Sequence, residues 1–232
     1  MTMIMYNKLI GVFAGVALLL VPRLWALVRK QAMPLRWVGD GPVDGFGWAA
    51  GLAVPGLGLT VLGGAMTLTE PLTAKPYINA MFGQPTFYLG LLLLAASWFL
   101  ARNRGDDLTE DRLRHVLRPT SWGVAGLGII LTFCTLAILR FNVVSSAPPE
   151  EPITGLLNDY PIAENTFFAV MYGLAAVGAL LFPKAITSDR AWRVLYWAWT
   201  GSGIFFLLFA GMNFYTHTGM LVNILEGTSY RW

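Results

Sequence analysis

Long apolar runs recur along the chain and are separated by short polar connections. Each run has close to the roughly 20 residues that an α-helix needs to cross a bilayer. We place these runs at residues 9–28, 46–68, 86–101, 121–138, 166–183 and 194–213. The third run is short and needs flanking aromatic residues to complete its span. The pattern predicts six transmembrane helices in one all-α membrane domain, a polytopic helical bundle over residues 1–232.

The composition favours a membrane protein over a soluble one. Hydrophobic residues make up 56% of the chain and charged residues 12%, whereas a soluble domain carries roughly 25% charged residues. The first run has the position of a secretory signal, but Pro22 and Arg23 interrupt it and no clear cleavage site follows. We therefore expect a retained helix. The connections are too short to hold a separate soluble domain.

One set of helix ends carries most of the arginine, lysine and tryptophan. The tryptophans of this set are Trp25, Trp37, Trp48, Trp98, Trp122, Trp192, Trp197 and Trp199. Tryptophan favours the membrane interface, and cytoplasmic loops collect arginine and lysine. The pattern predicts a multi-pass membrane protein with the basic loops in the cytoplasm and both termini outside. This asymmetry accounts for the net charge of +3 without a nucleic-acid partner.

The basic stretch 102–118 has the pattern of a short surface helix. Asp107 and Glu110 have the spacing of a capping box, and Glu110 with Arg114 forms a favourable i,i+4 pair. The Arg118-Pro119 step predicts its end. The apolar residues of this stretch that could rest on the membrane or on a partner are Leu113, Val116 and Leu117. We expect a solvated connector between the third and fourth spans.

Two outer loops resemble each other. Residues 70–73 (EPLT) precede Thr86-Phe87, and residues 151–154 (EPIT) precede Thr166-Phe167. The helices before the two loops share a Gly-Leu-Gly segment followed by threonine. The similarity favours a parallel repeat of a two-helix hairpin, in which spans two and three are duplicated as spans four and five. Spans one and six would complete a ring of three helix pairs.

The same loops carry a family resemblance. The run 76–85 (PYINAMFGQP), together with 151–155 (EPITG) and 164–167 (ENTF), resembles a prokaryotic family of polytopic membrane proteins known as domain of unknown function 981. The resemblance spans roughly helices two to five. It implies a membrane-helical fold and carries no activity, so it transfers no catalytic residue to this chain.

The predicted interior is poor in ionisable groups. The central parts of spans two to five contain no Asp, Glu, Lys, Arg or His. Because an ionisable group inside a bilayer usually marks an ion pathway, their absence argues against proton relay or charge-coupled transport. Close helix contacts are predicted at Gly11-x-x-x-Gly15 and Gly47-x-x-x-Gly51. Pro55 should kink the second span, and the kink could shape a cavity.

Metal and haem sites have little support. His115 and His217 belong to opposite membrane faces, so they cannot share one haem iron. An outer metal site, for example for copper, would use His217 with Glu164, Asp159 or Glu70, but these residues lack the spacing of a ligand set. No cofactor is predicted.

A structural network on the outer side is an alternative to a metal site. In that network Arg140 pairs with Glu164 or Glu151 and holds the second loop over the helices, while Glu70 belongs to the first loop.

Three functional hypotheses remain open. The first is a non-catalytic accessory subunit that packs in the lipid bilayer against other membrane subunits, of a respiratory or oxidase complex, or against itself. The second is a small permease or a lipid- or quinone-binding protein with a cavity near Pro55. The third is an outer-face metal or haem enzyme. No nucleophile–base pair or phosphate-binding loop favours an enzyme.

Overall fold

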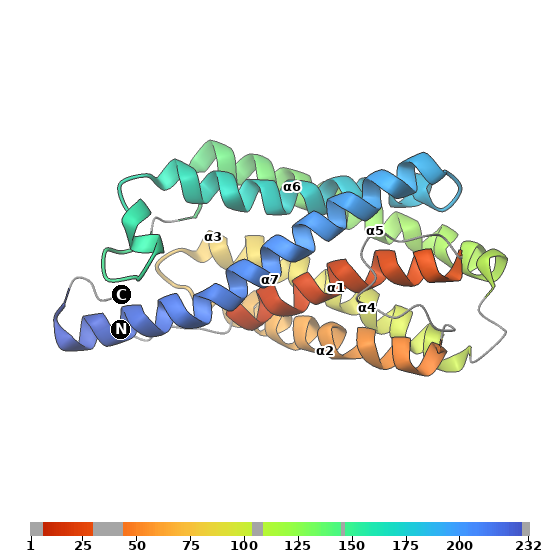
Figure 1. The fold of residues 1–232 in the computed structure, drawn as a ribbon, viewed down its shortest axis with the longest axis horizontal. Coiled ribbons are helices and arrows are strands. Elements are labelled where there is room, and N and C mark those ends of the chain that lie inside the picture. The colour runs from red at the N-terminus through yellow and green to blue at the C-terminus, as the bar shows by residue number, and fades with distance from the viewer. Residues whose placement is uncertain (1–6, 30–43, 104–108, 145–146, 229–232) are drawn as a thin grey trace.

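The structure, a computed structural model, describes residues 7–29, 44–103, 109–144 and 147–228. Every regular element in these ranges is helical, and six helical runs are long and apolar enough to cross a membrane (Figure 1). They are α1 (Asn7–Val28), α2 (Gly45–Thr69), the continuous run of α3 (Pro76–Ile78), η1 (Asn79–Gly83) and α4 (Gln84–Arg102), then α5 (Glu110–Phe141), α6 (Pro161–Ala185) and α7 (Asp189–Glu226). A short 3₁₀ turn, η3 (Thr154–Leu157), lies in the loop before α6. The prediction of an all-helical bundle with six spans is confirmed.

The prediction of a separate surface helix over 102–118 is wrong, because α5 runs without a break from Glu110 through Pro119 to Phe141. Pro119 removes the backbone donor of one helical hydrogen bond, yet the helix continues on both sides of it. Proline is tolerated in membrane helices more readily than in soluble ones. The hydroxyls of Thr120 and Ser121 donate to the nearby carbonyls of Val116 and Arg118. Asp107 lies outside the described residues; Thr109 caps α5 by accepting the backbone N–H of Arg112.

The helices pack as three pairs. α2 packs along α4, α5 along α6, and α1 along α7, while α4 and α5 touch only sparsely. In Figure 1, α7 crosses α1 diagonally, and α1 begins toward the end of the bundle at which α7 finishes. The core lies between the pairs: one apolar cluster joins α1 and α7 to α5 and α6, and a second joins α1 to α2 and α4.

In both hairpins, the side-chain amide of an asparagine near the start of the second helix bonds to the loop before that helix. The side-chain amide of Asn79 accepts from the backbone N–H of Leu72 and donates to its carbonyl. The amide of Asn165 makes the same two bonds with Val144. Both asparagines are fully buried. Each amide therefore fixes the loop that precedes its own helix, with the kind of paired N–H and C=O bonds that a neighbouring β-strand makes.

The helix contacts inside the two hairpins also correspond. Gly56 of α2 lies against Leu93 and Leu94 of α4, and Gly128 of α5 lies in the same way against residues 179 and 180 of α6. The hydroxyl of the threonine four residues after each glycine donates to that glycine's carbonyl. These close approaches need glycine because a Cβ at Gly128 would lie 2.9 Å from the Leu180 nitrogen.

The register of the repeat differs from the one predicted from the loops. α2 and α5 both end in a left-handed residue, Glu70 (φ 42°) and Asn142 (φ 48°). Glu70 therefore corresponds to Asn142, and the loop motif at 151–154 has no counterpart at 70–73. The duplicated hairpin is real in the structure, whereas the similarity of the two EP motifs is not its cause.

Phe82 and Phe168 mark the relation between the hairpins. Each lies three residues after its loop-holding asparagine, so the two are equivalent by the repeat. Their rings meet edge to face with centroids 5.8 Å apart. Equivalent residues can touch only close to the axis that relates the two copies. The pseudo-symmetry axis therefore passes between these rings.

Small residues let α1 and α7 cross closely. A Cβ on Gly15 would lie 2.8 Å from the Gly203 carbonyl oxygen, and one on Gly11 would lie 2.7 Å from the Ala210 Cβ. The predicted contact at Gly11 and Gly15 is therefore present. The contact predicted at Gly47 and Gly51 is loose, because a Cβ on Gly51 would meet only the Leu20 side chain, at 3.9 Å.

Candidate functional site

A cavity of about 150 Å³ lies toward the basic end of the bundle, the set of helix ends that carries most of the arginines and lysines. All six long helices contribute to its wall. The aromatic side chains that line it are Trp25, Phe99, Phe182, Trp192 and Trp199, and Leu52 and Leu113 are among the aliphatic ones. The predicted cavity near Pro55 is not this one, since the proline in its wall is Pro22 of α1.

The wall of the cavity is apolar. Thr120 brings a hydroxyl to it, and that hydroxyl donates to the Val116 carbonyl of its own helix. The indole N–H of Trp199 donates to the Ala175 carbonyl at 3.0 Å. These groups are satisfied by the protein and offer little to a polar ligand. An apolar cavity of about 150 Å³ stays dry and takes up a benzene-sized apolar molecule.

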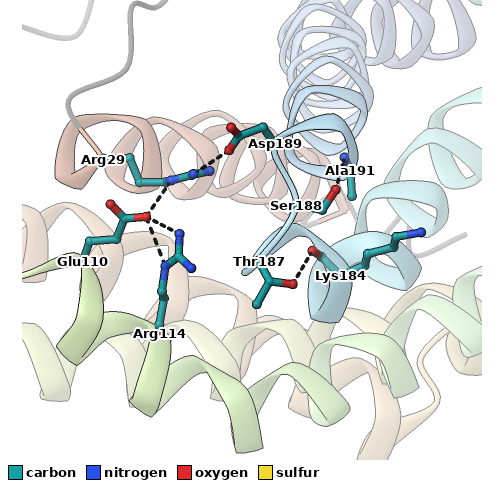
Figure 2. A network of polar contacts seen from close by, with 8 residues as sticks. All are labelled: Arg29, Glu110, Arg114, Lys184, Thr187, Ser188, Asp189 and Ala191. Carbon is teal, nitrogen blue, oxygen red and sulfur yellow. Dashed lines mark hydrogen bonds and ion pairs between the residues drawn. The ribbon is translucent and has the colours of Figure 1, made fainter.

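A charged network lies at the basic end (Figure 2). Arg29, just after α1, donates from Nε to Glu110 Oε1 at 3.0 Å and from Nη2 to Asp189 Oδ1 at 2.5 Å. Arg114 donates to the same Glu110 oxygen, as the i,i+4 pairing predicted. Arg29 thus joins the ends of α1, α5 and α7. We call Arg29, Glu110, Arg114 and Asp189 the basic-end clamp.

The local sequence explains why carboxylates stand at these positions. Glu110 and Asp189 lie in the first turns of α5 and α7, where the helix dipole favours negative charge. Ser188 precedes Asp189 and caps α7 by accepting the Ala191 N–H (Figure 2). The hydroxyl of Thr187 donates to the Lys184 carbonyl and so holds the tight α6–α7 connection. Both acids are fixed by the way their helices begin.

The clamp and the cavity are one helical turn apart. Glu110 precedes Leu113 by three residues, Asp189 precedes Trp192 by three, and Arg29 follows Trp25 by four. Residues three or four apart share one face of a helix, and Leu113, Trp25 and Trp192 all line the cavity. The clamp therefore lies on the water-facing side of the cavity.

The opposite end holds a buried polar cluster. His217 Nε2 of α7 lies 3.5 Å from Glu151 Oε1 of the loop before α6. Lys8 of α1 is buried close by, with its ammonium 5.1 Å from the Phe214 ring centroid. We call Lys8, Glu151 and His217 the outer cluster. Asn213 Oδ1 and Thr216 Oγ1, on the buried face of the same part of α7, lack a hydrogen-bond partner.

The structure places the other residues singled out from the sequence apart from each other. Glu70 and Asp159 are exposed, and Glu164 is half-buried in the first turn of α6. Arg140 is exposed, with its guanidinium 5.8 Å from the Phe141 ring centroid. Among the described residues no ion pair joins Arg140 to Glu151 or Glu164, and no three His, Cys, Asp or Glu side chains form a group that could hold a metal.

Sequence reasoning missed Arg29, Asp189 and Lys8. Arg29 belongs to the basic set by its charge alone, and Asp189 was not singled out, although a carboxylate just after a Ser cap signals a helix start. Leu113 was assigned to a connector, although its helical spacing to Val116 and Leu117 indicates a buried face. No feature of the sequence identifies Lys8 as buried.

Comparison with known proteins agrees with the resemblance found in the loops. The profile of a family described as "Protein of unknown function (DUF981)" matches residues 1–220. No curated protein and no solved structure matches the chain. Because the family match covers nearly all of the 232 residues, the chain belongs to the DUF981 family.

Proposed function

We propose that this multi-pass protein binds an apolar molecule in the basic-end cavity, in the cytoplasmic membrane of a prokaryote. The observation that carries the proposal is a cavity of about 150 Å³ with an apolar wall, with the ion pairs of the basic-end clamp on its water side. Pockets that bind small molecules are concave and mostly apolar. The wall supports a lipid- or quinone-binding protein better than a permease, because a polar solute would find few hydrogen-bond partners there.

Filling the cavity tests the proposal. Ala96 of α4 lines the cavity, so Ala96→Phe should occupy part of its volume and lower the amount of apolar ligand that copurifies. The measurement is native mass spectrometry of the full chain released from mild detergent, with extraction of bound lipid. Ala50→Phe is the matched control, since Ala50 is exposed and outside the cavity wall. Equal ligand retention by wild type and Ala96→Phe would contradict the proposal.

An accessory role in a larger membrane assembly is a second candidate. The observation in its favour is that α5 is the least buried of the six long helices, with 22% of its most apolar stretch buried inside the protein. Its exposed face includes Trp122, Phe133 and Leu136, which another membrane subunit or a second copy would cover. Purification in mild detergent tests this role. A stable, isolated monomer with no copurifying subunit would argue against it.

A further inference from the structure

The cavity is open toward the lipid side between α4 and α5. Ala95 of α4 lines the cavity and is also exposed on the surface of the bundle. Val116 and Thr120 of α5 line it as well and are half-buried. These two helices pack against each other far less than the helices within either hairpin. A chain-like molecule in the bilayer can therefore reach the cavity without separating a well-packed helix pair.

The water side is closed by contrast. The Arg29 side chain is only 9% exposed and is bonded to carboxylates on two other helices. A molecule arriving from water would have to break both ion pairs, and an apolar molecule has no compensating contact for their charges. The open side and the closed side together indicate an occupant that is already dissolved in the bilayer.

The surface of α4 next to the opening carries a positive charge, Arg102, at its basic end. Ala95, Trp98 and Arg102 are all exposed and follow the i, i+3, i+7 spacing of one helix face. The Arg102 guanidinium lies 4.5 Å from the Trp98 ring centroid. Seven residues of helix place Arg102 roughly 10 Å nearer the basic end than Ala95. A tryptophan and an arginine at this depth match the headgroup region of a bilayer, while Ala95 matches the acyl-chain region.

We infer that the occupant of the cavity is an acyl chain of an anionic phospholipid, which enters between α4 and α5 and keeps its headgroup beside Arg102. The inference rests on the proposed function, since it names the ligand class of the same cavity. An acyl chain fits the apolar wall, and the order of Arg102, Trp98 and Ala95 along α4 follows the order of headgroup, interface and chain in a phospholipid. Each basic residue near a membrane surface adds attraction for anionic lipids.

Quenching of the cavity tryptophans by brominated lipid tests the inference. The full chain is placed in phosphatidylcholine nanodiscs that contain either phosphatidylglycerol or phosphatidylcholine with brominated acyl chains, at equal fractions. The difference in fluorescence between wild type and Trp199→Phe isolates Trp199, which is 6% exposed. Trp192→Phe, at a second cavity tryptophan, replaces it if Trp199→Phe does not fold. Trp122, which is 77% exposed, reports ordinary contact with lipid.

We expect brominated phosphatidylglycerol to quench Trp199 at about a fivefold lower fraction than brominated phosphatidylcholine, the equivalent of about 1 kcal/mol for one arginine. Arg102→Gln should remove most of this preference. Arg140→Gln should leave it unchanged, because Arg140 also stacks on an aromatic ring but lies at the opposite end of the bundle.

The outcomes separate the inference from the proposed function. Equal quenching of Trp199 by both brominated lipids, or an unchanged preference in Arg102→Gln, would overturn the anionic lipid and leave an apolar ligand in the cavity. Quenching of Trp122 but not of Trp199 by either lipid would overturn the inference, because no chain then enters the cavity. In that case the ligand retention of Ala96→Phe decides whether another apolar molecule, such as a quinone, binds there.

Discussion

The two ends of the bundle use charged side chains in different ways. At the basic end, the clamp residues are bonded to each other and remain partly in contact with water, with Asp189 63% exposed. At the outer end, Lys8 and Glu151 are buried, and polar atoms of Asn213 and Thr216 on the same stretch of α7 lack partners. The basic-end charges close a cavity, whereas the outer charges lie inside the protein.

The outer cluster connects the loop before α6 to α7 and α1. Asn223 Nδ2 of α7 donates to the Glu150 carbonyl at 2.8 Å, and Pro152 packs so closely on Gly219 that a Cβ there would lie 2.5 Å from its ring. Glu151, which contacts His217 at 3.5 Å, lies between Glu150 and Pro152 in the sequence of the loop. Removing one buried partner leaves the others without a counter-charge, which costs far more than losing an exposed pair. The outer end should therefore be the more sensitive of the two.

The largest effect is expected at Glu151. Glu151→Ala removes the buried carboxylate. Lys8 then keeps a buried charge without a counter-charge, and His217 loses its polar partner. The free energy of unfolding should therefore fall by about 3 kcal/mol. Thermal unfolding of the purified chain in detergent, followed by circular dichroism, measures the loss. Asp159→Ala is the control in the same loop, because Asp159 is exposed. A loss for Glu151→Ala no greater than that of the control would contradict a buried structural cluster.

The next effect concerns the two loop-holding amides. Asn79→Leu and Asn165→Leu each leave a buried backbone N–H and carbonyl without partners, which costs about 2 kcal/mol. The same unfolding measurement applies to both variants. Because the two sites are equivalent by the repeat, both variants should lose stability, with the larger loss at Asn165, whose amide also donates to the Pro161 carbonyl at 2.8 Å. A loss of stability at only one of the two sites would show that the two asparagines occupy equivalent positions without both contributing to stability.

The spans could be predicted from the sequence because the length of an apolar run is a local property. The continuity of α5 through Pro119 could not, because a proline can either end a helix or be accommodated within it, and the residue alone does not decide which. Arg23 shows the same limit. A long basic side chain near the end of a membrane helix commonly extends to the interface, yet Arg23 is 1% exposed. Burial on a given side of a helix is decided by its neighbours.

The tryptophans illustrate what the sequence could and could not say about the site. Their sorting to one end agrees with an interfacial belt, and Trp98 and Trp122 are indeed exposed. Trp25, Trp192 and Trp199 belong to the same set but are buried in the cavity wall. Composition and position along the chain were the same for both groups. Only the packing of α1 and α7 against the hairpins decides which tryptophans line the cavity and which face the membrane interface.

A smaller effect is expected at the basic-end clamp. Arg29→Gln removes two ion pairs, but Glu110 and Asp189 regain contact with water, so the loss of stability should be about 1 kcal/mol or less. Because the clamp closes the cavity, the same variant should increase quenching of the cavity tryptophans by aqueous iodide. Arg140→Gln, at an exposed arginine of the other end, should change neither quantity. Unaltered iodide quenching in Arg29→Gln would mean that the clamp does not close the cavity.

The smallest effect, and the one that compares the two ends most directly, is that of salt. Raising the salt concentration from about 0.1 M to about 1 M shortens the Debye length from about 10 Å to about 3 Å. Screening of this kind acts on charges in contact with water, as at Asp189, and little on buried ones, as at Glu151. High salt should therefore reduce the difference in stability between wild type and Arg29→Gln, and leave the difference between wild type and Glu151→Ala nearly unchanged. If both differences shrank together, the outer cluster would have to be hydrated, and the contrast between a water-facing clamp and a buried cluster would fail.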